Sequence, residues 1–288
     1  MKILVTGSGG MLASALAELL EREHRVSALS RKEFDITDVS SVRKNILRVS
    51  PQVIVNCAAY TKVDKAEEER SEAFLINAEG PRNLAAVCRK LGARLIHIST
   101  DFVFDGKKSV PYKEEARPYP LSVYGMSKLQ GEKNVQDETT DFIIIRTSWL
   151  YGRGKDNFVK KVASLARKRK DLPVVYDQIG TPTYTGDLST AIMNLLDKPP
   201  GIYHFSNEGV ASWYDFAHAI VEEMKKGGMK MRLEALRPIL TEEYPAPAKR
   251  PAYSVLDKSK YKRITGEAIP HWRESLSRYV AEELWRRR

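Results

Sequence analysis

The pattern that most constrains the fold lies at the start of the chain. A short apolar run of β-forming residues, from Lys2 to Thr6, is followed by a glycine-rich segment and then by leucines at helical spacing. Such a run and such a spacing are typical of a strand and an amphipathic helix. The sequence therefore predicts a strand, a tight turn and a helix in direct succession.

The glycine spacing within this turn favours a nucleotide site over a connection without a ligand. Gly7 and Gly10 lie three residues apart, and Ala13 lies three further on. In dinucleotide-binding turns one glycine makes the bend, the next admits the pyrophosphate, and a small third residue lets helix and sheet pack closely. Free N–H groups at the helix N-terminus favour the anion. We predict that Gly7, Gly10, Met11 and Leu12 bind a dinucleotide.

Apolar strands and helical stretches alternate through the rest of this half. The expected strands are 25–30, 53–56, 94–99 and 142–146, and the expected helices are 39–49, 67–91, 123–136 and 157–169. Strand–helix alternation predicts parallel pairing and right-handed crossovers. We therefore expect an α/β fold, a Rossmann-like doubly wound parallel sheet, with its ligand crevice at the carboxyl ends of the strands. No internal repeat or low-complexity linker interrupts it.

The chain becomes less regular after about residue 170. Nine prolines and shorter helical stretches such as 213–225 follow, and the chain closes with a helix predicted over 273–287. Leu276, Val280 and Leu284 form one stripe of that last helix, which favours packing on a core. We expect residues 1–170 to form the dinucleotide-binding domain and 171–288 a smaller, mainly substrate-binding domain.

The end of the second expected strand bears on the choice of cofactor. The position that often carries an acidic residue for the ribose 2′-hydroxyl holds Ser30 and Arg31 instead. A guanidinium accommodates the 2′-phosphate of NADP. This favours NADPH over NADH, although Arg31 as a solvated residue stacking on adenine is the alternative. Asp35 and Ile36 are expected at the adenine end, while Thr37 or Asp38 alternatively caps the helix over 39–49.

Tyr124 and Lys128 are four residues apart in a segment expected to be helical, so both side chains face the same way. A nearby ammonium stabilises a phenolate and lowers the pKa of the phenol. We therefore predict that Tyr124 is an acid/base residue whose pKa Lys128 lowers. The alternative is an ordinary pair on an amphipathic helix.

Composition narrows the class of protein. The 288 residues are 42% hydrophobic and 29% charged, which is typical of a soluble globular protein of one to two domains. We expect no leader peptide, no membrane span and a cytoplasmic location. Cys57 and Cys88 offer neither a disulfide framework nor metal-ligand spacing, so no metal site is predicted.

The net charge of +10 raises the question of nucleic-acid binding. The basic residues are spread along helix faces among acidic ones, as expected for a solvated surface, and no nucleic-acid-binding motif accompanies them. We predict no nucleic-acid partner, and expect the positive field to attract an anionic substrate. The residues concerned include Lys160, Lys161, Arg167, Lys168, Arg169, Lys170 and Arg286–Arg288.

Several longer runs carry a resemblance to a known family, namely 56–61 with 63–64 and 66–67, 99–106, 124–128, 146–151, 157–158 and 177–183. These runs resemble the extended short-chain dehydrogenases/reductases and, within them, the dTDP-4-dehydrorhamnose reductase branch. The resemblance covers nearly the whole chain. Ala13 stands in place of a third glycine, and Phe102 stands where the branch usually has tyrosine, which removes one polar contact to the sugar.

The resemblance implies NADPH-dependent reduction of a nucleotide-linked 4-keto sugar. Tyr124 would donate the proton, Thr100 would orient the carbonyl or the phenol, and Lys128 would hold the nicotinamide ribose. Thr100 alternatively only caps a turn. The loop after the third strand would contact the cofactor, through Ala58, Ala59 and Tyr60.

The resemblance also implies residues for the nucleotide sugar. Thr61 and Val63 would line the sugar pocket, and Asp101 would bind a sugar hydroxyl or cap the following turn. Trp149 would stack on thymine or pack in the core. Arg250 would meet the diphosphate or lie at the surface.

Two other functions stay open at this stage. One is another nucleotide-sugar reductase or an epimerase. The run 177–183 disfavours the epimerase only. The other is a regulatory NADP-binding subunit resembling that of methionine adenosyltransferase. The resemblance further implies a homodimer, Mg²⁺ at the dimer contact in some relatives, and segments of the C-terminal half that return to the Rossmann sheet.

Overall fold

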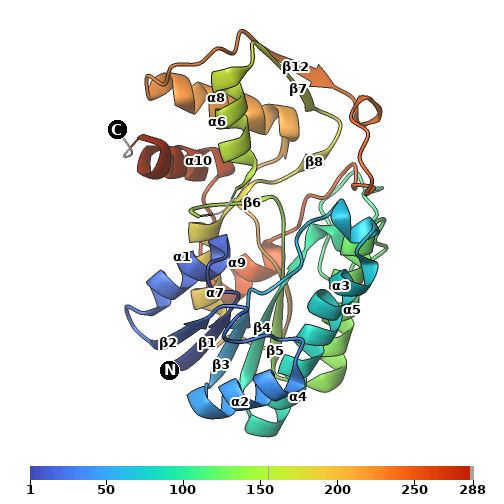
Figure 1. The fold of residues 1–288 in the computed structure, drawn as a ribbon, viewed down its shortest axis with the longest axis vertical. Helices are drawn as coiled ribbons and strands as arrows, with labels where there is room; N and C mark the ends of the chain where they lie inside the picture. The colour runs from blue at the N-terminus through green and yellow to red at the C-terminus, as the bar shows by residue number, and fades with distance from the viewer. Residues whose placement is uncertain (155, 286–288) are drawn as a thin grey trace.

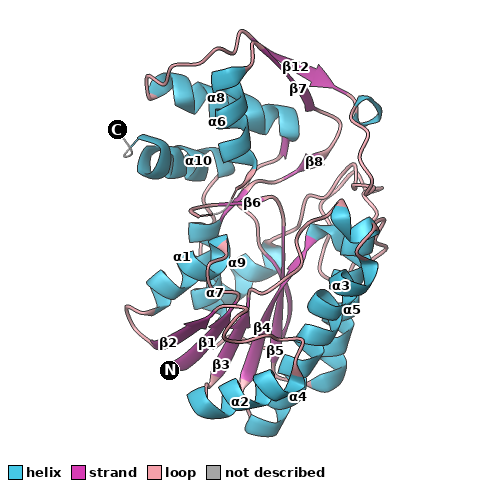
Figure 2. Cartoon of the chain, viewed as in Figure 1, coloured by secondary structure: helices cyan, strands magenta, loops and turns pink. Residues whose placement is uncertain are grey.

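A six-stranded parallel sheet forms the base of the molecule in the computed structural model, which describes residues 1–154 and 156–285 (Figures 1 and 2). The strand order is β10-β5-β4-β3-β1-β2, and each neighbouring pair is parallel. The predicted α/β doubly wound fold is confirmed. The strands are β1 (Lys2–Thr6), β2 (Arg25–Leu29), β3 (Val53–Asn56), β4 (Arg94–Thr100), β5 (Phe142–Thr147) and β10 (Gly201–His204).

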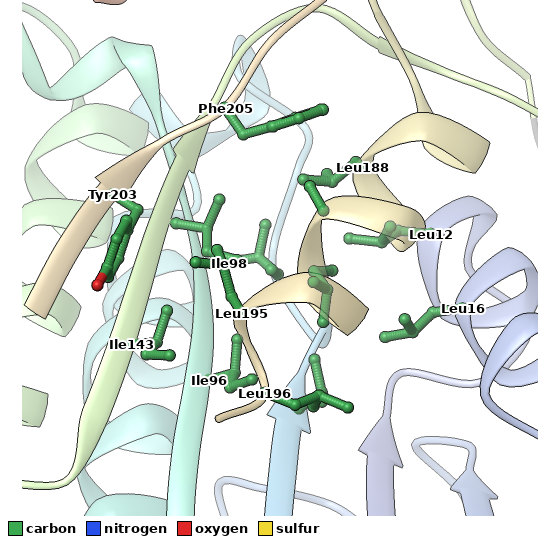
Figure 3. Packing of buried hydrophobic residues seen from close by; sticks show 14 of the residues in the cluster. Leu12, Leu16, Ile96, Ile98, Ile143, Leu188, Leu195, Leu196, Tyr203 and Phe205 are labelled. Carbon is green, nitrogen blue, oxygen red and sulfur yellow. The ribbon is translucent and has the colours of Figure 1, made fainter. Parts of the chain in front are cut away.

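Helices cover both faces of this sheet because alternate strand residues point to opposite faces and both sets are apolar. Ile96, Ile98 and Ile143 face α1 (Met11–Leu20), α7 (Thr185–Leu195) and α9 (Ser259–Thr265), where leucines of α1 and α7 meet them (Figure 3). The apolar side chains on the other face of the sheet pack against α2 (Val39–Val49), α4 (Gly80–Leu91) and α5 (Val123–Glu138). The central strands are therefore buried on both sides.

The direction of winding reverses at β1, which lies between β2 and β3. The connections that leave β1 and β3 run to opposite sides, so their carboxyl ends border the crevice where doubly wound sheets bind ligands. The glycine turn follows β1 directly, and the polar residues that follow β3 and β4 lie at the same edge.

A second lobe packs above the carboxyl ends of the strands (Figure 1). Its core joins β6 (Leu150–Tyr151), α6 (Phe158–Lys168), β7 (Asp171–Val175), α8 (Trp213–Lys226) and α10 (Trp272–Val280). Three short pairings complete this part: β12 (Ala235–Ile239) with β7, β11 (Ala211–Ser212) with β8 (Ile179–Gly180), and β6 with β9 (Thr183–Tyr184).

The boundary between the lobes is not a single cut at residue 170, because the chain passes from one lobe to the other more than once. Helix α6 packs with α8 in the second lobe, while α7, β10 and α9, from later in the chain, pack with the sheet. Leu276 and Val280 of the predicted last helix are buried, and a π-helical turn, Ala281–Trp285, extends it. The Leu284 side chain and residues 286–288 lie outside the described residues. None of the described helices combines the length and apolarity that crossing a bilayer requires.

The helix predicted over 67–91 is present from Arg70 onward, but it is not one regular α-helix. The segment divides into a 3₁₀ turn (Lys65–Glu67), α3 (Arg70–Phe74), a π-helical turn (Leu75–Glu79) and α4. Pro81 explains the change, because it lacks the N–H that would bond the Asn77 carbonyl and its ring would clash with that carbonyl. Helix α5 approaches the same carbonyl so closely that a Cβ on Gly131 would lie 2.1 Å from it.

Replacing Gly131 by alanine should therefore destabilise the protein. Helix propensity alone would favour alanine by about 1 kcal/mol, but the clash with the Asn77 carbonyl should cost about 1–3 kcal/mol, as overpacking does. Thermal unfolding should show a lower Tm for Gly131→Ala and little change for the control Gln130→Ala, an exposed neighbour. A Gly131→Ala protein that melts at or above the native temperature would contradict this packing account.

Candidate active site

The turn after β1 has the geometry that a dinucleotide needs. Gly7 has φ +76°, and a Cβ there would lie 2.9 Å from the Ala58 nitrogen, so only glycine fits. Gly10 donates its N–H to the Gly7 carbonyl at 3.0 Å and precedes α1 without a side-chain cap. The first-turn N–H groups of α1 are thus left for an anion.

Met11 and Leu12 begin α1 but differ in where their side chains lie. The Leu12 side chain is buried in the core between α1 and the sheet, so only its backbone faces the turn (Figure 3). Met11 is half-buried, and its sulfur accepts from Asn157 Nδ2 at 3.6 Å. Because Asn157 caps α6, this contact joins the dinucleotide turn to the second lobe.

The end of β2 holds a carboxylate after all, which corrects the expectation drawn from the sequence. Glu33 folds back so that its Oε2 accepts from the Ser30 N–H at 2.9 Å and the Ser30 hydroxyl at 2.7 Å. These bonds lower the pKa of Glu33. Arg31 is exposed and forms loose ion pairs with Asp35 at 3.8 Å and Glu72 at 3.6 Å. The carboxylate of Glu33 and the guanidinium of Arg31 therefore both lie where a 2′-phosphate would bind.

The side chains of Asp35 and Ile36 both contact neighbouring parts of the protein. Asp35 Oδ1 accepts from the N–H and the hydroxyl of Thr37 at 2.9 and 2.7 Å. Ile36 is buried in the core, and a Cβ on Gly80 would lie 2.6 Å from it. Asp38 accepts from Ser40 N at 2.8 Å and caps α2, so the capping alternative is confirmed for Asp38.

The loop after β3 is fastened from two sides. The Ala58 N–H donates to Thr6 Oγ1 and Asn56 Oδ1, both at 3.2 Å. The Tyr60 N–H donates to Asn77 Oδ1 at 2.8 Å, and Asn77 Nδ2 donates back to the Tyr60 carbonyl at 3.0 Å. The π-helical turn thereby holds the backbone of the expected cofactor loop.

Side chains of this loop point in different directions. The Tyr60 phenol is buried and donates to Glu69. Ala59 is half-buried, Thr61 is exposed and Val63 is half-buried, just before the 3₁₀ turn Lys65–Glu67. The hydroxyl and the backbone N–H of Tyr60 are thus both engaged within the protein, by Glu69 and Asn77.

Tyr124 and Thr100 meet at the carboxyl end of β4. Burial raises the pKa of Tyr124 to about 12, and the neighbouring Thr100 hydroxyl opposes this rise only in part. Thr100 is buried and also accepts from the Phe102 N–H at 3.2 Å. Thr100 therefore caps the following turn and touches the phenol as well.

Lys128 does not lower the pKa of Tyr124 in this structure, so that prediction is wrong. Its Nζ points to the sheet instead, donating to the Ile98 carbonyl at 2.6 Å and lying 3.4 Å from His97 Nε2. Burial lowers the pKa of Lys128 to about 8, against the opposing charge of Glu132. The phenol and the amine are thus both shifted toward their neutral forms.

Asp101 is buried beside this pair. Its Oδ1 accepts from Thr100 Oγ1 at 3.0 Å, and burial raises its pKa to about 6, opposed by the hydrogen bond of Ser254. Within the described residues, Oδ2 has no well-aligned hydrogen-bond partner. The cap of the next turn comes from Thr100. Phe102 packs edge-on against the Tyr124 ring, with centroids 5.6 Å apart.

Trp149 is enclosed on both faces of its indole, which favours the packing alternative. Trp213 stacks on it with centroids 3.6 Å apart and planes 7° apart. A Cβ on Gly180 would lie 2.7 Å from Cε2, 2.8 Å from Cζ2 and 2.9 Å from Nε1. Because the ring-junction atom is nearest, Gly180 lies over the other face of the ring. A base can stack on Trp149 only if one of these neighbours moves.

Arg250 is engaged in an ion pair rather than free for a phosphate. Its Nη1 and Nη2 donate to the two carboxylate oxygens of Asp64 at 3.0 and 2.8 Å, and this lowers the pKa of Asp64. Nη1 also donates to the Ala248 carbonyl at 2.9 Å. The pair ties the loop after β3 to a segment almost 190 residues later.

Sequence reasoning missed four polar or aromatic residues around this site. Asn77 holds the Tyr60 backbone, and Glu67 accepts from the Val123 N–H at 2.9 Å, at the start of α5. Trp213 covers Trp149, and His97 lies against Lys128. Pro81, four residues after Asn77, was the one visible signal. The described residues contain no group of three or more His, Cys, Asp or Glu side chains placed to hold a metal ion.

The Asp64–Arg250 pair should contribute measurable coupling to stability. A double-mutant cycle of Asp64→Asn and Arg250→Gln should give about 0.5–1 kcal/mol, because the contact is bidentate and only partly solvated. The matched control is the exposed pair Arg237–Asp171, at 3.3 Å, for which the coupling should be close to zero. Equal coupling in the two cycles would show that the lobe contact has no special stabilising role.

The chain matches known proteins over nearly its whole length. The family model described as the RmlD substrate binding domain matches residues 1–284. The spore coat polysaccharide biosynthesis protein SpsK of Bacillus subtilis is 45% identical, over 98% of this chain and 97% of its own length. The dTDP-4-dehydrorhamnose reductase of Sinorhizobium fredii is 42% identical, over 97% of both.

A solved structure agrees with these matches. The dTDP-4-dehydrorhamnose reductase of Bacillus anthracis, in complex with NADP, superposes with a TM-score of 0.92 at 41% identity, covering 98% of this chain and all of that one. Identity at this level over full length, together with the family model, decides the relationship. The chain belongs to the RmlD family, the family of the dTDP-4-dehydrorhamnose reductases.

Proposed function

We propose that this protein reduces the C4 ketone of dTDP-4-dehydrorhamnose with NADPH, giving dTDP-rhamnose. The observation that carries the proposal is the placement of the Tyr124 phenol beside Thr100 at the crevice edge of the sheet, one helical turn from Lys128. The names of the relatives and the NADP held by the Bacillus anthracis enzyme support it.

The dinucleotide would lie across the turn after β1. Gly7 and Gly10 let the pyrophosphate approach the uncapped start of α1. Arg31 would pair with the 2′-phosphate. The N–H and the hydroxyl of Ser30 would have to release Glu33 before they could donate to that phosphate. The adenine end would meet Asp35 and the backbone of Ile36. The loop Ala58–Tyr60 would contact the cofactor through its backbone.

Reduction needs a proton for the ketone oxygen, and Tyr124 is suited to provide it. NADPH supplies the hydride to C4 when bound. A phenol whose pKa lies near 12 keeps its proton at neutral pH until the ketone oxygen becomes an alkoxide, which is a stronger base. Thr100 orients the phenol and the carbonyl. Lys128 would hold the nicotinamide ribose.

The sugar nucleotide would occupy the space between the lobes. Thr61 and Val63 would line the sugar, and the buried Asp101 would accept a sugar hydroxyl through Oδ2. Trp149 would meet the thymine after Trp213 moves. Arg250 would approach the diphosphate from its ion pair with Asp64.

The division of labour and the setting of the enzyme are also proposals. Residues 1–170 would mainly bind the cofactor and 171–288 the substrate, with β10, α7 and α9 completing the sheet lobe. By family resemblance we propose a cytoplasmic homodimer. A regulatory subunit that only binds NADP is the second candidate, and the intact Thr100–Tyr124 contact favours catalysis over it.

Turnover measured by NADPH absorbance tests the proposal directly. NADPH should be oxidised only when dTDP-4-dehydrorhamnose is present, and Tyr124→Phe should cut the rate roughly 10²- to 10⁴-fold with NADPH binding nearly intact. Phe102→Leu is the control, because it changes a neighbouring ring and leaves the proton donor in place. NADPH binding without any substrate-dependent oxidation would instead support the regulatory subunit, and an unaltered Tyr124→Phe rate would remove Tyr124 from the mechanism.

Charge at the end of β2 should set the cofactor preference. Arg31→Asp should weaken NADPH binding roughly tenfold more than NADH binding, because a carboxylate repels the 2′-phosphate. Glu33→Gln should act in the opposite direction and strengthen NADPH several-fold, since it removes a negative charge that Ser30 holds there. Fluorescence titration with both cofactors measures the two ratios. Parallel losses for NADPH and NADH in Arg31→Asp would show that Arg31 does not read the phosphate.

A further inference from the structure

A chain of buried polar side chains runs across the sheet and ends at Lys128. Thr6 Oγ1 donates to Asn56 Oδ1 at 2.6 Å, Asn56 Nδ2 lies 3.0 Å from His97 Nδ1, and His97 Nε2 lies 3.4 Å from Lys128 Nζ. All four side chains are at most 2% exposed. The chain joins the ends of β1 and β3 to the middle of β4 and to α5.

The orientation of the Asn56 amide is determined by its neighbours. The Ala58 backbone N–H, which can only donate, points to Asn56 Oδ1 at 3.2 Å, beside the bond from Thr6. A turned amide would place its NH₂ against that N–H. Asn56 therefore presents its oxygen to the loop and its Nδ2–H to His97.

This orientation selects one form of His97. Nδ1 has to accept the hydrogen bond from Asn56, so it carries no proton. Full burial holds the pKa of His97 well below its ordinary value, and the charge of Lys128 lowers it further. The ring is therefore neutral, and its single proton is on Nε2.

The Nε2–H of His97 is then directed at the Lys128 nitrogen. A neutral amine can accept from this N–H through its lone pair while donating to the Ile98 carbonyl, which it reaches at 2.6 Å. An ammonium has only donors, so it would set N–H against N–H at this contact. The imidazole thus discriminates between the two protonation states of Lys128.

We propose that Asn56 and His97 are positioning residues that act through Lys128, by aiming the His97 Nε2–H at its nitrogen and so favouring the amine over the ammonium. Lys128 is thereby kept able both to lose and to gain a proton near neutral pH, close to the proton donor Tyr124. This consequence for turnover rests on the proposed function, whereas the state of His97 does not.

Other groups also face Lys128 and act on its charge. Glu132, one turn along α5, raises the pKa of Lys128, but its carboxylate already accepts from the Arg146 guanidinium at 2.7 to 3.2 Å. The Cys57 thiol, beyond β3, stays neutral because burial raises its pKa to about 12. Burial lowers the pKa of Lys128, to about 8, so His97 acts in the same direction as burial.

Nitrogen-15 NMR of the full chain labelled in histidine tests the first step without reference to activity. The sequence has five histidines, and the His97 signals are those missing from His97→Asn. We expect Nε2 protonated and Nδ1 bare, without titration between pH 5 and 9. A proton on Nδ1, or a ring that becomes imidazolium in this range, would overturn the proposal whether or not the protein reduces the sugar.

The pKa of Lys128 tests the second step, followed by the carbon-13 signal of its Cε, which Lys128→Met identifies. In Asn56→Asp the carboxylate requires a proton on His97 Nδ1, so Nε2 turns into an acceptor for the ammonium. In His97→Asn the side-chain oxygen still accepts from Asn56, but the shorter amide no longer extends an N–H to the position of Nε2 beside Lys128. Both variants should raise the pKa of Lys128 by on the order of one unit.

The control is His218→Asn, which alters an exposed histidine paired with Glu222 on α8 and should leave the pKa of Lys128 unchanged. An unchanged pKa in both Asn56→Asp and His97→Asn would refute the role of the two residues. If either variant fails to fold, the state of His97 in the native chain still decides the first step.

Discussion

The close approach between the glycine turn and the loop after β3 is the constraint on which the crevice depends. Gly7 can adopt its positive φ beside the Ala58 nitrogen only because it has no Cβ. The Ala58 N–H then reaches Thr6 and Asn56, so the ends of β1 and β3 are fastened together. Parallel pairing of β1 and β3 already puts both loops at one edge of the sheet, and this contact brings their backbones together there.

Burial, rather than nearby charge, has the largest influence on the groups proposed for catalysis. It raises the pKa of Tyr124 and lowers that of Lys128, which shifts both groups toward their neutral forms. Leaving a charge unpaired in such a place is costly, and the polar chain through Asn56 and His97 gives the amine suitable partners instead. The buried Arg146–Glu132 pair lies next to this chain and neutralises the nearby carboxylate.

Local patterns predicted the parts of the fold that local forces decide. The glycine turn, the five N-terminal strands and α2 follow from spacing and periodicity, because burial of apolar side chains requires them. The helix over 67–91 contains a π-helical turn that its spacing did not reveal, just before Pro81, whose missing N–H changes the hydrogen-bond pattern. Glu33 was overlooked because its carboxylate reaches the end of β2 only by folding back onto Ser30.

The sequence by itself determined the doubly wound class, the dinucleotide turn and the Tyr124–Lys128 pair, since each depends on residues close together in the chain. The tertiary structure alone decided what those residues touch. Trp149 lies between Trp213 and Gly180, Arg250 pairs with Asp64, and Lys128 faces His97. Contacts between residues 30 to 190 positions apart follow from how helices and lobes pack, and no local pattern carries that information.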